Sequence, residues 1–134
     1  MKNEYRAILT GLLALYAAAS LFHHAHNAAF LDQYPNMPAW LSPAAVYAAW
    51  LASTAIGLLG YWLLRRGYRF AGLSLLVAYG CYGLEVLAHY ALAPVSAHTP
   101  MMHWSIAFEA TTALVVLVAV ARMALLRGQR EEVA

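Results

Sequence analysis

The sequence has 134 residues, of which 63% are hydrophobic and 10% are charged, with a formal net charge of +2 at pH 7. This length allows one domain, residues 1–134, and the low charge excludes an ordinary soluble domain, in which about a quarter of the residues are charged. The weak positive charge also excludes nucleic-acid binding, which needs a clustered basic face.

Four apolar segments are each long enough to cross a hydrocarbon core as a helix, which takes about 20 residues. In chain order they cover approximately residues 7–31, 44–64, 70–93 and 101–126. The first begins after Lys2 and Arg6 and runs too long for a cleaved signal, so we interpret it as a retained helix. Prolines and an Arg-Arg-Gly turn mark short connections between the segments. Short connections make successive helices antiparallel.

The basic residues predict how these helices are oriented. All eight lie at one end of the predicted bundle: Lys2, Arg6, Arg65, Arg66, Arg69, Arg122, Arg127 and Arg130. The positive-inside rule places that end in the cytoplasm. We therefore predict an all-α integral membrane protein, an up-down four-helix bundle with both termini cytoplasmic, in a bacterial inner membrane. Its partners would be the lipid bilayer and either further copies of the chain or a larger membrane complex.

Small and aromatic residues add two expectations. Glycines on the second and third helices would let backbones approach closely, at Gly57, Gly60, Gly72, Gly80 and Gly83. Tyr34 and Trp40, in the first connection, suit the membrane–water interface, where aromatic rings gather.

Ionisable residues are concentrated in the half of the bundle away from the arginines. This half contains two mid-helix carboxylates, Glu85 and Glu109, and all six histidines: His23, His24, His26, His89, His98 and His103. An ionisable residue in the membrane costs about 2.5–3.5 kcal/mol on insertion scales, so such groups are expected to face the bundle interior and to pair.

Helical spacing predicts which of these residues meet. On the first helix, one face holds Tyr16, Ser20, His23, Asn27 and Phe30. His24 points away from that face, and His98 is expected to be a solvated loop residue. On the third helix, Glu85 and His89 are four residues apart and are therefore expected to be neighbours. The predicted pocket is lined by His23, His26, Asn27, Glu85, His89 and Glu109, with His103 near its mouth.

Metal or ligand binding is the first function that this pocket suggests. Imidazole and carboxylate ligands suit copper, zinc or iron, and the candidate metal ligands are His23, Glu85, His89 and Glu109. Asn27, His26 and His103 would contact a small polar ligand. Haem between His89 and either His24 or His26 is a weaker option, and covalent haem is excluded because the chain has no CxxCH.

Two other classes of function remain open. The buried carboxylates and histidines could serve acid–base chemistry, either by passing protons in a transporter or in a membrane-embedded enzyme. The enzyme would use Glu85 and Glu109 as acid and base on a lipid-soluble substrate, and it predicts a cleft open to the lipid. An accessory subunit of a larger complex would use the polar residues only for packing. Interhelical hydrogen bonds average about 0.6 kcal/mol, which is less than the insertion cost of these groups, so the sequence favours a functional site.

Overall fold

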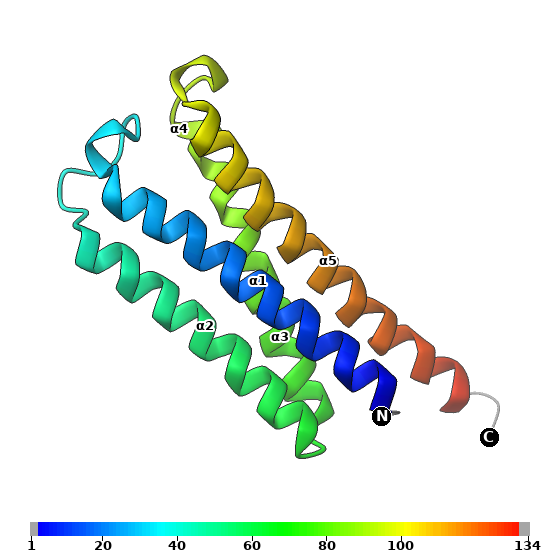
Figure 1. Cartoon of the computed structure of the whole chain (residues 1–134). Coiled ribbons are helices and arrows are strands. Elements are labelled where there is room, and N and C mark those ends of the chain that lie inside the picture. Colours follow the sequence, from blue (N-terminus) through cyan, green and yellow to red (C-terminus); the bar gives the residue numbers. More distant parts are fainter. Residues whose placement is uncertain (1–2, 132–134) are drawn as a thin grey trace.

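The computed structural model describes residues 3–131 and the side chains of residues 4–125. Lys2 lies outside this range, and so do the side chains of Arg127 and Arg130. Four long helices dominate the fold (Figure 1): α1 (Asn3–Ala29), α2 (Pro43–Arg65), α3 (Arg69–Leu84) and α5 (Pro100–Glu131). The all-α prediction and the four helical segments are confirmed, with boundaries that differ by a few residues.

The helices form an antiparallel bundle in which each packs against two neighbours. α1 packs against α2 and α5, and α3 packs against the same two helices. Both termini and the turn between α2 and α3 lie at one end of the bundle, which we call the terminal end (Figure 1). The connection between α1 and α2 and the segment that precedes α5 lie at the other end, which we call the loop end.

Local sequence signals fix the ends of α2. Ser42 caps its start by accepting a hydrogen bond from the backbone N–H of Ala45, and Pro43 occupies the first turn, where a missing N–H is tolerated. At the other end, Gly67 adopts a φ of 92°, a left-handed conformation that glycine takes without steric cost. This turn sends α3 back alongside α2.

Glycines bring the helices together in the terminal half of the bundle. A Cβ atom on Gly72 would lie 2.7 Å from the backbone nitrogen of Leu64, and one on Gly60 would lie 2.9 Å from Cβ of Leu75. The glycines therefore mark close helix contacts, as predicted. A buried apolar cluster fills this half and includes Leu9, Leu76, Val116 and Val120.

The third predicted segment is not one continuous α-helix. α3 ends at Leu84, a 3₁₀ segment η2 covers Glu85–Ala88, and a short helix α4 covers His89–Leu92. A further 3₁₀ segment, η3 (Val95–Ala97), precedes α5, and η1 (Leu31–Gln33) follows α1. The residues of η2 include neither glycine nor proline, so nothing in the local sequence indicates the change of helix type.

Candidate functional site

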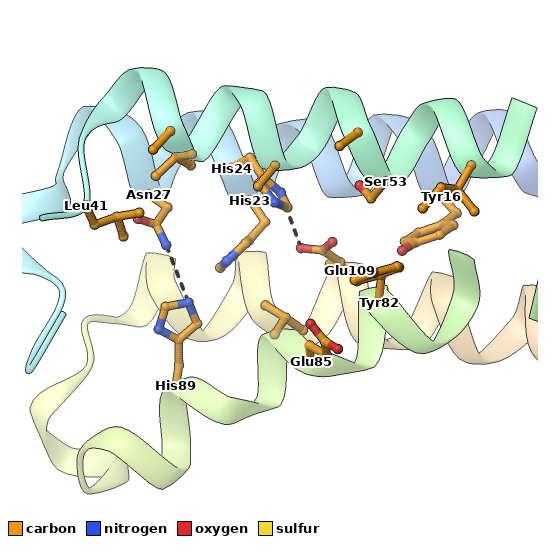
Figure 2. Close-up of a pocket in the computed structure, with 16 residues that line it drawn as sticks. Tyr16, His23, His24, Asn27, Leu41, Ser53, Tyr82, Glu85, His89 and Glu109 are labelled. Atoms are coloured by element: carbon orange, nitrogen blue, oxygen red, sulfur yellow. Dashed lines mark hydrogen bonds and ion pairs between the residues drawn. The ribbon is translucent and has the colours of Figure 1, made fainter. Parts of the chain in front are cut away.

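A cavity of about 390 Å³ lies among the helices in the loop half of the bundle (Figure 2). Its volume is within the range of small-molecule sites, about 300–1,000 Å³. All four helical segments contribute to it, together with Leu41 from the first connection. The lining residues with polar side chains are Tyr16, His23, His24, Asn27, Ser53, Tyr82, Glu85, His89 and Glu109.

The two sides of the cavity differ in chemistry. α2 forms an almost entirely apolar wall, with Ser53 as its single polar lining residue; the other lining residues of α2 are Ala45, Val46, Ala49, Ala52 and Ile56. The polar groups come from other helices: α1, which lies beside α2, and α4 and α5, across the cavity, present imidazole, amide and carboxyl groups (Figure 2). The arrangement suits a molecule with one polar end and one apolar part.

Glu109 is the more deeply buried of the two carboxyl groups of the cavity, with 2% of its surface exposed. Its nearest imidazole is His24, whose Nδ1 lies 4.0 Å from Oε2 of the carboxyl group. That oxygen is buried without a hydrogen-bond partner among the described residues. A buried carboxylate is costly unless it is paired, so Glu109 is a group that would interact strongly with a proton, a cation or a hydrogen-bond donor.

The prediction that His24 points away from the site is wrong. α1 occupies a corner of the bundle between α2 and α5, so a wide arc of its surface faces the interior. His23 and His24, about 100° apart around the helix, both line the cavity. The predicted face of Tyr16, Ser20, His23 and Asn27 is buried, but Phe30 is exposed.

Hydrogen bonds fix the tautomers of His23 and His24, the two histidines of α1 that line the cavity. Ser105 donates its hydroxyl proton to the carbonyl of Met102, so Oγ of Ser105 accepts from Nδ1 of His23 at 3.1 Å. Nδ1 of His24 donates to the carbonyl of Ser20 at 2.9 Å. In both neutral rings Nε2 is therefore the nitrogen with a free lone pair.

Asn27 and His89 form the part of the cavity nearest the loop end. Nδ2 of Asn27 and Nε2 of His89 lie 3.4 Å apart (Figure 2). Oδ1 of Asn27 and Nδ1 of His89 are buried without hydrogen-bond partners in the described part of the chain. Because buried polar groups in proteins are normally satisfied, these atoms and Oε2 of Glu109 indicate where polar groups of a ligand would be bound favourably.

Glu85 is not buried with the other polar residues. It lines the cavity but is exposed at its edge, and within residues 4–125 it has no ion pair with His89. Consecutive residues of a 3₁₀-helix are about 120° apart instead of about 100°. The 3₁₀ turn of η2 therefore separates Glu85 and His89 around the helix, which contradicts the predicted i, i+4 pair.

His26 and His103, which were predicted to contact a ligand, lie outside the cavity lining and form hydrogen bonds with tyrosine hydroxyls instead. Nδ1 of His26 lies 2.8 Å from the hydroxyl of Tyr34, and Nδ1 of His103 lies 2.7 Å from the hydroxyl of Tyr90. Tyr34 was predicted to lie at the interface, but only 3% of it is exposed. Burial raises the pKa of the Tyr34 phenol above its usual value.

The connections at the loop end fold over the histidines. His98, predicted to be solvated, is 7% exposed, and its Nδ1 donates to the carbonyl of Pro94 at 3.1 Å. Asn36 has a φ of 58° and donates from its side-chain amide to the carbonyl of Leu92 at 2.8 Å. This bond ties the first connection to the end of α4. Sequence reasoning missed Tyr34 and His98 because long-range packing, not local pattern, buries them.

The predicted metal ligands do not form a recognisable metal centre. In the part of the chain that the structure describes, no three histidine, cysteine, aspartate or glutamate side chains are grouped as ligands of one ion. His23, His89 and Glu109 share the cavity, whereas Glu85 lies at its edge. Binding of copper, zinc, iron or haem stays a prediction.

No family model matches the sequence, and neither the curated proteins nor the solved structures compared with it include a match. Function is therefore inferred from the residues and geometry of the cavity.

Proposed function

We propose that the four helices span a membrane, with both termini cytoplasmic and the cavity in the outward half. Four helices are long and apolar enough to cross a bilayer, and large hydrophobic side chains such as Leu58, Phe70 and Leu125 are exposed on the bundle surface. The basic residues at the terminal end support this orientation. In a Cys81→Ser background, a membrane-impermeant thiol reagent added outside is expected to label Ser96→Cys but not Arg66→Cys. The reverse labelling pattern would contradict the orientation.

Within that membrane, we propose that the cavity binds an amphiphilic molecule that enters from the lipid. The open side of the cavity is the observation that carries this proposal. Ala49, Ala52 and Glu85 line the cavity and are exposed. Asn27 and Glu109 line it from α1 and α5 and are buried. The opening therefore lies between α2 and η2, and in a bilayer this side would face acyl chains.

The unpaired atoms of the cavity indicate the chemistry of the ligand's polar end. Oε2 of Glu109 and Oδ1 of Asn27 are acceptors without donors, and leaving such groups unpaired costs about 1–3 kcal/mol each. Among the side chains of residues 4–125, no lysine or arginine lines the cavity, so a phosphate group would lack the cations that usually bind it. The favoured ligand is a long-chain molecule that ends in a hydroxyl, phenol or amine group.

Glu109 is also the group best placed for acid–base chemistry on that ligand. Its unpaired oxygen can accept a proton from a bound hydroxyl or ammonium group, or return one, and such transfers contribute about 10²–10⁴-fold to rates in enzymes. The neighbouring imidazole of His24, 4.0 Å away, can exchange the proton. Glu85, which was predicted as the partner of Glu109, is left at the entrance instead of at the centre.

A pair of neighbouring alanines on α2 provides a matched test. Ala49 lines the cavity, whereas Ala48 is exposed and is not among the lining residues. Ala49→Phe should fill the cavity and abolish photo-crosslinking of a diazirine-bearing long-chain alcohol in lipid nanodiscs. Ala48→Phe should crosslink like the wild type, and a long-chain phosphate probe should label the wild type weakly. Equal labelling of both variants would refute ligand binding in the cavity.

A further inference from the structure

Five histidine rings form a continuous series between the cavity and the loop end of the bundle. The series runs from His24 through His23, His89 and His98 to His103, with successive ring centroids 5.7, 5.3, 6.4 and 5.8 Å apart. It starts beside Glu109, the buried carboxyl group of α5. It ends at a half-buried ring in the first turn of the same helix. The rings come from α1, α4, the segment after η3, and α5.

Every ring in the series is held in place through Nδ1 or Nε2 and keeps the other nitrogen free. His98 donates from Nδ1 to the carbonyl of Pro94, and its Nε2 is buried without a partner. His89 faces Asn27 with Nε2, and its Nδ1 is buried without a partner. His103 uses Nδ1 to contact a tyrosine hydroxyl, and the two rings of α1 leave Nε2 free, as described above. A ring that is fixed at one nitrogen and free at the other can take up a proton and release it.

We propose that these five histidines conduct protons between the outer aqueous phase and Glu109. A proton from water binds His103 and passes from ring to ring, directly or across one bridging water. His24 takes up the proton at Nε2, and the resulting imidazolium releases its Nδ1 proton to the carboxylate of Glu109, whose Oε2 lies 4.0 Å from Nδ1, in place of the bond from Nδ1 to the carbonyl of Ser20. This last step leaves a neutral imidazole and a carboxylic acid, so one proton moves and no electron is exchanged. The proposal goes beyond ligand binding, and its test needs no ligand.

The surroundings of Glu109 direct this path toward the loop end. Besides His24, the ionisable groups around Glu109 are those that line the same cavity, Tyr16, His23, Tyr82, Glu85 and His89, together with Tyr34 and Tyr79. α2 adds no ionisable group to the cavity lining. Toward the terminal end the buried cluster consists of Leu9, Leu76, Ala113, Val116 and Val120 together with Tyr16 and Tyr79. Tyr16 donates its hydroxyl proton to the carbonyl of Tyr79, and the cluster contains no imidazole or carboxyl group, so the series of histidines reaches Glu109 from the loop end.

The proposal is tested by the rate at which Glu109 takes up a proton. The protein in lipid nanodiscs is mixed rapidly from alkaline into acidic buffer, and the infrared C=O band of the carboxylic acid is followed in time. Glu109→Gln identifies the band by removing it. His98→Gln keeps a donor for the carbonyl of Pro94 but cannot carry a proton, so it should slow the appearance of the band at least about tenfold.

His26→Gln is the matched control, because His26 is also at the loop end but outside the series of rings. Its rate should equal that of the wild type. Thermal unfolding of both variants checks that the bundle is intact, and His103→Gln provides a second break if His98→Gln does not fold. The proton path would be overturned if His98→Gln and His103→Gln both left the rate of proton uptake unchanged, or if His26→Gln slowed it equally. Labelling by the long-chain alcohol should survive His98→Gln, so the two proposals fail independently.

Discussion

The two halves of the bundle are made from the same helices but differ in how tightly these helices pack. In the terminal half, glycines and buried apolar side chains bring α2 and α3 into backbone contact. In the loop half, α2 stands apart from η2 across the cavity, and polar atoms of Asn27, His89 and Glu109 are buried without partners. Packing in one half therefore stabilises the bundle and allows the other half to keep groups that lower its stability, as functional sites commonly do.

The largest effect is expected from a mutation in the terminal half. Gly72→Ala would place a Cβ atom 2.7 Å from the backbone of Leu64, and the helices would have to separate to accept it. Overpacking of this kind costs about 1–3 kcal/mol, and because the clash is with backbone we expect the upper part of that range. Denaturation of the purified protein by sodium dodecyl sulfate measures the loss.

Gly11→Ala is the control for that measurement. In the described part of the chain, no neighbouring side chain or helix lies within 4 Å of a Cβ atom at Gly11, and alanine is the better helix former by about 1 kcal/mol. The variant should be as stable as the wild type or slightly more stable. Equal destabilisation by both alanines would show that close packing of the terminal half does not hold the bundle together.

A smaller effect of opposite sign is expected from Glu109→Gln in the loop half. The amide keeps the shape of the side chain but cannot ionise, so the variant no longer buries a potential charge without a partner. We expect a gain of about 1 kcal/mol in the free energy of unfolding, together with loss of the proton-dependent infrared band. A loss of several kcal/mol would instead assign Glu109 to holding the bundle together.

The smallest expected effect is a pH dependence of the free energy of unfolding that is caused by Tyr34. Burial raises the pKa of the Tyr34 phenol above its usual value of 10.0, so the folded protein retains this proton at a pH where the unfolded chain releases it. This difference in pKa stabilises the folded protein fully below pH 10, and the stabilisation is lost as the pH rises through the higher pKa of Tyr34 in the folded state. Tyr34→Phe also lacks the bond to His26 and should be less stable by about 1 kcal/mol at neutral pH.

Thermal unfolding at a series of pH values separates these two contributions. The difference between the wild type and Tyr34→Phe should narrow above pH 10, because only the wild type can ionise at this position. A difference that stays constant with pH would mean that Tyr34 is as solvated in the folded protein as in the unfolded chain.

The sequence predicted the helices well because length and hydropathy determine them almost alone. It also predicted that His23, Asn27, Glu85, His89 and Glu109 line one pocket, and all five line the cavity. The predicted pairing of Glu85 with His89 was wrong because it assumed a constant 100° per residue. The 3₁₀ turn that separates the two residues contains no glycine or proline.

The other errors have a common physical origin. His24 reaches the cavity because α1 stands in a corner of the bundle, and Tyr34 and His98 are buried because the connections fold back over the helix ends. These contacts join segments far apart in the chain, so no periodicity in a single segment reports them. Their rings nevertheless complete the polar end of the bundle.

The bond between Asn36 and the end of α4 has a consequence for affinity. It fastens the first connection to the end of α4, which leaves the side between α2 and η2 as the wide entrance. A molecule that arrives there has already partitioned into the bilayer, so it meets the protein at a far higher local concentration than in water. A modest dissociation constant would then suffice for occupancy, and selectivity would depend on how each candidate distributes between bilayer and solvent as much as on its contacts.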